Sequence, residues 1–114
     1  MKLLACALLS TVMGAAAFAD EAPNPAHGKE VYDYWCATCH SAGDDYPGTV
    51  ALGVKYGGKV PAVLDERRDL VPEFVKTIVR NGVSVMPFFR KTEISDSDLD
   101  ALAAYLARKD KKRR

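Results

Sequence analysis

Residues 36–40 read Cys36-Ala37-Thr38-Cys39-His40, and this short stretch decides how the rest of the chain is interpreted. Two cysteines separated by two residues, with a histidine directly after the second, place three reactive side chains within little more than one helical turn. Nearly half of the 114 residues are apolar, which excludes a globally disordered chain. The length predicts one small domain with a single core, and this stretch is its candidate site.

Three chemistries fit this spacing. In the first, the thiols of Cys36 and Cys39 add across the two vinyl groups of one haem, and His40 ligates the iron. The second is a thioredoxin-like dithiol, which would need a βαβ setting that the sequence does not show. The third is a zinc site, which needs four ligands, and His27 is the only other histidine. The spacing favours one covalently bound haem c.

The N-terminal residues have the three parts of a secretory signal peptide. Lys2 precedes an apolar run from Leu3 to Val12, and small residues then lead to an A-x-A-like cleavage site before Asp20. We therefore predict that residues 1–19 are cleaved and that the protein is periplasmic, without a stable membrane span. An uncleaved N-terminal anchor is the alternative, because the run approaches the roughly 20 apolar residues that cross a bilayer.

The charge balance argues against nucleic acid as a partner. The 16 basic and 15 acidic residues leave no basic surplus to neutralise phosphates. Cleavage would remove Lys2 and Cys6, so the mature chain would be neutral and would keep only the two cysteines of the motif. Residues 20–108 are the predicted domain, and residues 109–114 form a basic C-terminal tail, either simply solvated or a docking element for an acidic partner or a membrane surface.

Helix caps and 3.6-residue periodicity predict an all-α chain. The predicted helices run from the cap Asn24 to about Thr38, from Pro72 to Asn81 with Gly82 as the stop, and onward from the cap Ser95, with Leu99, Leu102, Ala103 and Leu106 buried. Residues 41–69 are expected to be irregular, with short helical turns after Thr49 and from Pro61 to about Arg67, as in a segment wrapped around a ligand. Gly28 lies inside the first helix, which indicates close approach of another helix.

The chain resembles the class I c-type cytochromes, small monohaem proteins, over essentially all of its predicted mature length. In that family a glycine and an aromatic residue precede the first haem cysteine at steps of four, as Gly28 and Tyr32 precede Cys36. The resemblance implies the cytochrome c fold, with the N- and C-terminal helices packed together and loops wrapped around one covalently bound haem. It also implies that Gly28 and Tyr32 pack against Leu102 and Tyr105.

Two further implications follow from the resemblance. In the family, the haem-ligating histidine donates its other ring nitrogen to a proline carbonyl, and Pro47 is the nearest candidate to orient His40 in this way. The tracts 58–64 and 81–88 are similar to the cytochrome subunits that accept electrons from flavin-dependent alkylphenol dehydrogenases.

Met86 is the predicted second axial ligand of the haem iron. Met1 and Met13 would leave with the signal peptide, so Met86 would be the only methionine of the mature chain, followed by Pro87 in an apolar loop. Core packing is the alternative for a lone methionine in such a loop. His27 is the competing ligand, but it lies near the start of the first helix and is expected at the surface.

Two strong axial ligands leave no open position for a substrate, so the expected function is one-electron Fe(III)/Fe(II) exchange by an electron carrier that is not an enzyme. The expected partners are redox proteins, with a flavin or quinone dehydrogenase as donor and another cytochrome or an oxidase as acceptor. The alternatives are a ligand-responsive haem sensor or weak peroxidase whose Met86 bond opens, and a structural haem subunit of a dehydrogenase complex.

Overall fold

The computed structural model describes residues 22–109, whose regular elements are all helical, with an isolated bridge between Val83 and Met86 in one of the loops. The elements are α1 (Pro25–Trp35), α2 (Ala37–His40), α3 (Pro47–Tyr56), the 3-10 turn η1 (Leu64–Glu66), α4 (Pro72–Asn81) and α5 (Asp96–Ala107). The predicted all-α class is confirmed. The predicted signal peptide, and the basic tail after its first residue, lie outside the described residues.

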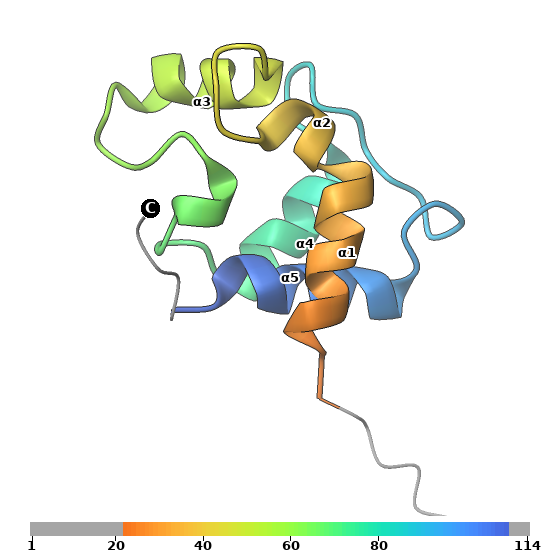
Figure 1. Ribbon diagram of the computed structural model, residues 1–114. Helices are drawn as coiled ribbons and strands as arrows, with labels where there is room; N and C mark the ends of the chain where they lie inside the picture. Colours follow the sequence, from red (N-terminus) through yellow and green to blue (C-terminus); the bar gives the residue numbers. More distant parts are fainter. Residues whose placement is uncertain (1–21, 110–114) are drawn as a thin grey trace, which may run out of the picture.

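Helices α1 and α5 form the most extensive interhelical contact, and they cross one another in Figure 1. Gly28 lies at the crossing: a Cβ atom added there would overlap the backbone carbonyl oxygen of Ala101 and lie 2.8 Å from Cβ of Tyr105. The rings of Tyr32 and Tyr105 pack with their centroids 5.7 Å apart, and Leu102 is completely buried. The close approach that Gly28 indicated is therefore confirmed.

Helix α4 completes the core by packing against α5. In Figure 1 it lies behind α1 and above α5. Its inner face consists of Val75 and Val79, each 5 % exposed. These residues join one cluster with the buried residues of the other elements, which are Val31, Tyr32, Leu70, Ile94, Leu99, Leu102, Ala103, Tyr105 and Leu106. The predicted buried face of the C-terminal helix is thus confirmed.

The first helix ends earlier than predicted, at Trp35 instead of Thr38. Cys36 remains in the right-handed helical region, but its φ of −112° is far from the ideal −63°, and α2 begins after it as a separate turn. The carbonyl of Cys36 accepts hydrogen bonds from the backbone N–H groups of both Cys39 (3.0 Å) and His40 (2.9 Å). This double acceptance tightens the turn that carries the motif.

The segment between α2 and α4 is more regular than predicted, because α3 begins at Pro47 and not after Thr49. The last residue of α3 is Tyr56, and Gly57, with φ +54°, caps its C-terminus. The second expected turn shortens to η1. Arg67, only 5 % exposed, forms an ion pair with Asp69, and its guanidinium lies 4.8 Å from the ring centroid of Tyr56. The segment is held together by polar and aromatic contacts that the sequence pattern did not predict.

No helix within residues 22–109 has the length and apolar character needed to cross a bilayer.

Candidate functional site

The two cysteines of the motif lie at the junction of α1 and α2, and neither is in a disulfide. Cys36 packs against the core cluster, whereas Cys39 is exposed. Burial, and secondly the proximity of Cys39, raises the pKa of the Cys36 thiol to about 12. A dithiol redox motif instead lowers the pKa of its attacking cysteine. Cys36 therefore lacks the activated thiolate of a dithiol redox motif.

His40 is the last residue of α2 and is half-buried. The hydroxyl of Tyr32 donates a hydrogen bond to its backbone oxygen at 2.9 Å, which fixes the main chain. Burial lowers the pKa of the ring, so His40 is neutral at neutral pH, which is the form that ligates a metal.

The hydrogen bond predicted between His40 and Pro47 is not formed. The buried Nδ1 atom of His40 has no hydrogen-bond partner among the described residues. Pro47 is the first residue of α3, so its carbonyl points along that helix, where it is an acceptor for the next turn. The sequence placed the correct segment near His40 but assigned the contact to the wrong atom.

Gly48, the residue after Pro47, packs against the ring of His40. A Cβ atom added at Gly48 would lie 2.6 Å from Cε1 and 2.8 Å from Nδ1 of His40, and 2.7 Å from the carbonyl oxygen of Cys39. The backbone of α3 therefore lies directly against the imidazole ring. Sequence reasoning missed this residue, because its only signal is a glycine in a helix where alanine is the better helix former.

Met86 lies in a tight turn after α4 and is half-buried against the core cluster. Its backbone exchanges two hydrogen bonds with Val83, at 2.9 and 3.1 Å. Gly82 opens the turn with φ +69° and ψ 172°, a conformation open essentially to glycine alone. The N–H of Phe89 then donates to the carbonyl of Val79 at 2.9 Å, which ties the end of the loop to α4.

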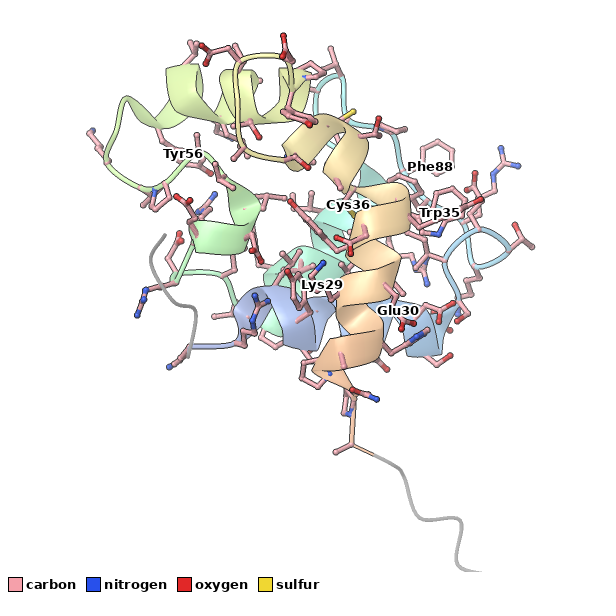
Figure 2. The ribbon with its side chains drawn as sticks, viewed as in Figure 1. Lys29, Glu30, Trp35, Cys36, Tyr56 and Phe88 are labelled. Atoms are coloured by element: carbon pink, nitrogen blue, oxygen red, sulfur yellow. The ribbon has the colours of Figure 1, made fainter. Side chains whose placement is uncertain are left out.

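The structure brings the motif and this loop to one region of the molecule. Cys36 and Met86 both pack against the same core cluster. The ring of Trp35, next to Cys36 in the chain, meets the ring of Phe89 edge-on with centroids 5.7 Å apart. Figure 2 shows Trp35 at the end of α1, beside the loop that carries Phe88.

His27, the competing ligand, lies near the other end of α1 and is exposed, as predicted. Its Nε2 atom is 2.6 Å from Oδ1 of Asp98, and its Nδ1 atom is 3.2 Å from Glu30. Both ring nitrogens are engaged at the surface.

The side chains present fit a haem c. Among the described residues no three His, Cys, Asp or Glu side chains form a group that could hold a metal ion, so Cys36, Cys39 and His40 do not converge on one point. A haem needs such an arrangement, because the thiols bind its periphery while the histidine binds its iron. Nδ1 of His40 is buried beside Gly48, so Nε2 is the ring nitrogen available to bind an iron.

Comparison with known proteins agrees with this geometry. The sequence pattern of the family described as "Cytochrome C oxidase, cbb3-type, subunit III" matches residues 23–106. Cytochrome c6 of Cyanidioschyzon merolae is 31 % identical over 87 residues, which cover 76 % of each chain. The cytochrome c subunit of 4-cresol dehydrogenase (hydroxylating) of Pseudomonas putida is 34 % identical over 80 residues, which cover 70 % of this chain and 58 % of that subunit. The chain therefore belongs to the cytochrome c family and is an electron-carrying protein with a covalently bound haem c.

Proposed function

We propose that the haem is attached through Cys36 and Cys39, that His40 and Met86 are the axial ligands of its iron, and that the protein is a periplasmic one-electron carrier. The observation that carries this proposal is the packing of Cys36 and Met86 against one core cluster. Two residues 50 positions apart in the chain thus border the same region. A haem bound there could be attached and ligated by both segments.

When bound, the haem supplies a reversible Fe(III)/Fe(II) couple that takes up or releases one electron. Cys36 and Cys39 fix its position through two thioether bonds. His40 offers a neutral ring nitrogen, and Met86 offers a soft thioether that favours ferrous iron and raises the reduction potential relative to two histidines. With both axial positions filled, a substrate would have no place on the iron, so the protein would transfer electrons without binding a substrate there.

The contacts around these residues would hold the ligands in place. The turn around Met86 is held by its hydrogen bonds to Val83, and the loop is held to α1 by the contact between Trp35 and Phe89. Side chains locked by packing and hydrogen bonds preserve a site's geometry. A rigid ligand set requires little rearrangement when the charge on the iron changes.

A dehydrogenase is the proposed electron donor, with another cytochrome or an oxidase as the acceptor. The support is the similarity to the cytochrome c subunit of 4-cresol dehydrogenase. A flavin or quinone dehydrogenase that co-purifies with the protein and reduces it rapidly in stopped-flow mixing would agree with this role. Failure of every co-purifying dehydrogenase to reduce the haem would favour a purely structural subunit.

Carbon monoxide separates the carrier from a ligand-responsive sensor or weak peroxidase. We expect the reduced wild-type protein to bind carbon monoxide poorly, because Met86 occupies the position that the gas needs. The Met86→Ala variant, in which that position is open, should bind it readily. Equal and rapid binding by both proteins would show that Met86 does not close the site, and would favour the sensor.

A further inference from the structure

The backbone of α3 packs against the imidazole of His40 at Gly48. The position that a Cβ atom of Gly48 would take lies 2.6 Å from Cε1 and 2.8 Å from Nδ1 of His40. Both distances are well inside van der Waals contact between carbon or nitrogen atoms. At this position glycine makes room for the ring, and any other residue would push against it.

The main chain on both sides of this ring is anchored. The hydroxyl of Tyr32 donates to the carbonyl of His40 at 2.9 Å, and the hydroxyl of Thr49 donates to the carbonyl of Ser41 at 2.7 Å. Thr49 is 7 % exposed and directly follows Gly48, so its hydrogen bond holds the start of α3 against the motif. Neither the His40 backbone nor the start of α3 can move away without breaking a partly buried hydrogen bond.

Among residues 22–109, no hydrogen bond directs the ring itself. Nδ1 of His40 is buried and has no partner among the described residues. Ligating histidines almost always donate this second nitrogen to a carboxylate, a carbonyl or water, which sets the orientation of the ring and strengthens it as a ligand. In this protein, steric contact is what remains to set the orientation.

We propose that Gly48 is the positioning residue of the axial histidine: its bare Cα packs against the imidazole and fixes the angle of the ring, in place of a hydrogen bond to Nδ1. This inference rests on the proposed role of His40 as an iron ligand. It predicts that the electronic properties of the iron depend on the absence of a single carbon atom at position 48.

Gly48→Ala tests the proposal, and Gly53→Ala is its matched control. Both glycines lie in α3 and neither has a positive φ, but a Cβ atom at Gly53 would meet only Cβ of Ala62, at an ordinary 3.7 Å. In the Gly48→Ala holoprotein we expect the His40 ring to tilt and to donate less electron density to the iron. The reduction potential should rise, and the hyperfine-shifted proton resonances of His40 in the oxidised protein should move. Gly53→Ala should leave both unchanged.

A second measurement needs only the wild-type holoprotein. In its reduced, diamagnetic form we expect a strong nuclear Overhauser effect between an α-proton of Gly48 and Hε1 of His40. Absence of this signal would overturn the proposal even if Gly48→Ala failed to mature with haem. A Gly48→Ala holoprotein that kept the wild-type potential and His40 resonances would overturn it as well.

These outcomes are distinct from a failure of the proposed function. If wild-type His40 shows no hyperfine-shifted resonances in the oxidised protein, His40 is not an iron ligand, and both proposals are wrong. If the wild-type resonances are present and unchanged in Gly48→Ala, the ligand assignment stands and only the role of Gly48 is contradicted.

Discussion

The ring of Trp35 meets the ring of Phe89 edge-on, with centroids 5.7 Å apart and ring planes inclined by 73°. Trp35 immediately precedes Cys36, and Phe89 follows Met86 by three residues. The contact therefore joins the haem-attachment motif to the loop that carries the proposed methionine ligand. Edge-to-face aromatic pairs contribute about 0.5–1.5 kcal/mol beyond the area they bury.

Phe89→Ala should weaken this junction. Phe89 is half-buried, so we expect the free energy of unfolding of the holoprotein to fall by roughly 2 kcal/mol, less than for a fully buried phenylalanine. Carbon monoxide should also bind the reduced variant faster, because the Met86 loop is less firmly held. Phe88→Ala is the control: Phe88 is 54 % exposed and should change stability by less than about 0.5 kcal/mol. Equal effects of the two substitutions in guanidinium titrations would contradict a specific role for the ring pair.

Gly82→Ala should disrupt the turn around Met86. An added Cβ would lie 2.7 Å from the carbonyl oxygen of Met86 and 2.9 Å from the nitrogen of Phe88, in a backbone conformation that alanine rarely adopts. We expect a loss of about 3 kcal/mol of stability, together with weaker methionine ligation. Gly57→Ala separates strain from collision, because Gly57 also has a positive φ but meets nothing within 4 Å. It should cost only about 1–2 kcal/mol and leave Met86 ligated.

The contact between His27 and Asp98 should make stability depend on pH. The hydrogen bond with Asp98, and then that with Glu30, raises the pKa of His27 above its ordinary value. A raised pKa means that the stabilisation is complete below about pH 6.5, the value in the unfolded chain, and disappears as the pH rises through the folded value. The same contact lowers the pKa of Asp98, so the stabilisation is also lost when strong acid protonates that carboxylate.

Thermal unfolding of the wild type and of His27→Gln across this range checks the prediction. The wild type should be the more stable protein at mildly acidic pH, and the difference should shrink as the solution becomes alkaline. A difference that stayed constant with pH would rule out the ion pair as its cause.

The predicted signal peptide and the covalent haem can both be checked by the mass of the mature protein. We expect the protein isolated from the periplasm to begin at Asp20, and to carry the additional mass of one haem that survives denaturation. A chain still beginning at Met1 in the membrane fraction would instead indicate the uncleaved anchor. Loss of the extra mass on denaturation would show that the haem is not covalently bound.

The features that local sequence signals control were predicted well. The limits of α4 match the predicted helix, because Pro72 and Gly82 determine its ends through the backbone angles that each residue permits. Ser95 caps α5 as predicted, accepting a hydrogen bond from the N–H of Asp98 at 3.1 Å. The close helix approach at Gly28 was predicted from the cost of a glycine inside a helix, together with the family resemblance.

The features that depend on distant segments were not predicted. The aspartates of α5 link it to other segments of the chain through the pairs Asp96 with Arg80 and Lys91, Asp98 with His27, and Asp100 with Lys76. The Gly48 contact and the Trp35–Phe89 pair are also tertiary. Neither leaves a periodic pattern in the sequence, because each joins only one residue to one residue.

The identity of the second axial ligand is the central claim, and one measurement tests it most directly. The oxidised wild-type protein should show the weak near-infrared charge-transfer band of a ferric iron bound by a thioether sulfur. Met86→Ala and Met86→His should both lose that band while keeping the covalent haem. Persistence of the wild-type band in either variant would show that Met86 is not the ligand.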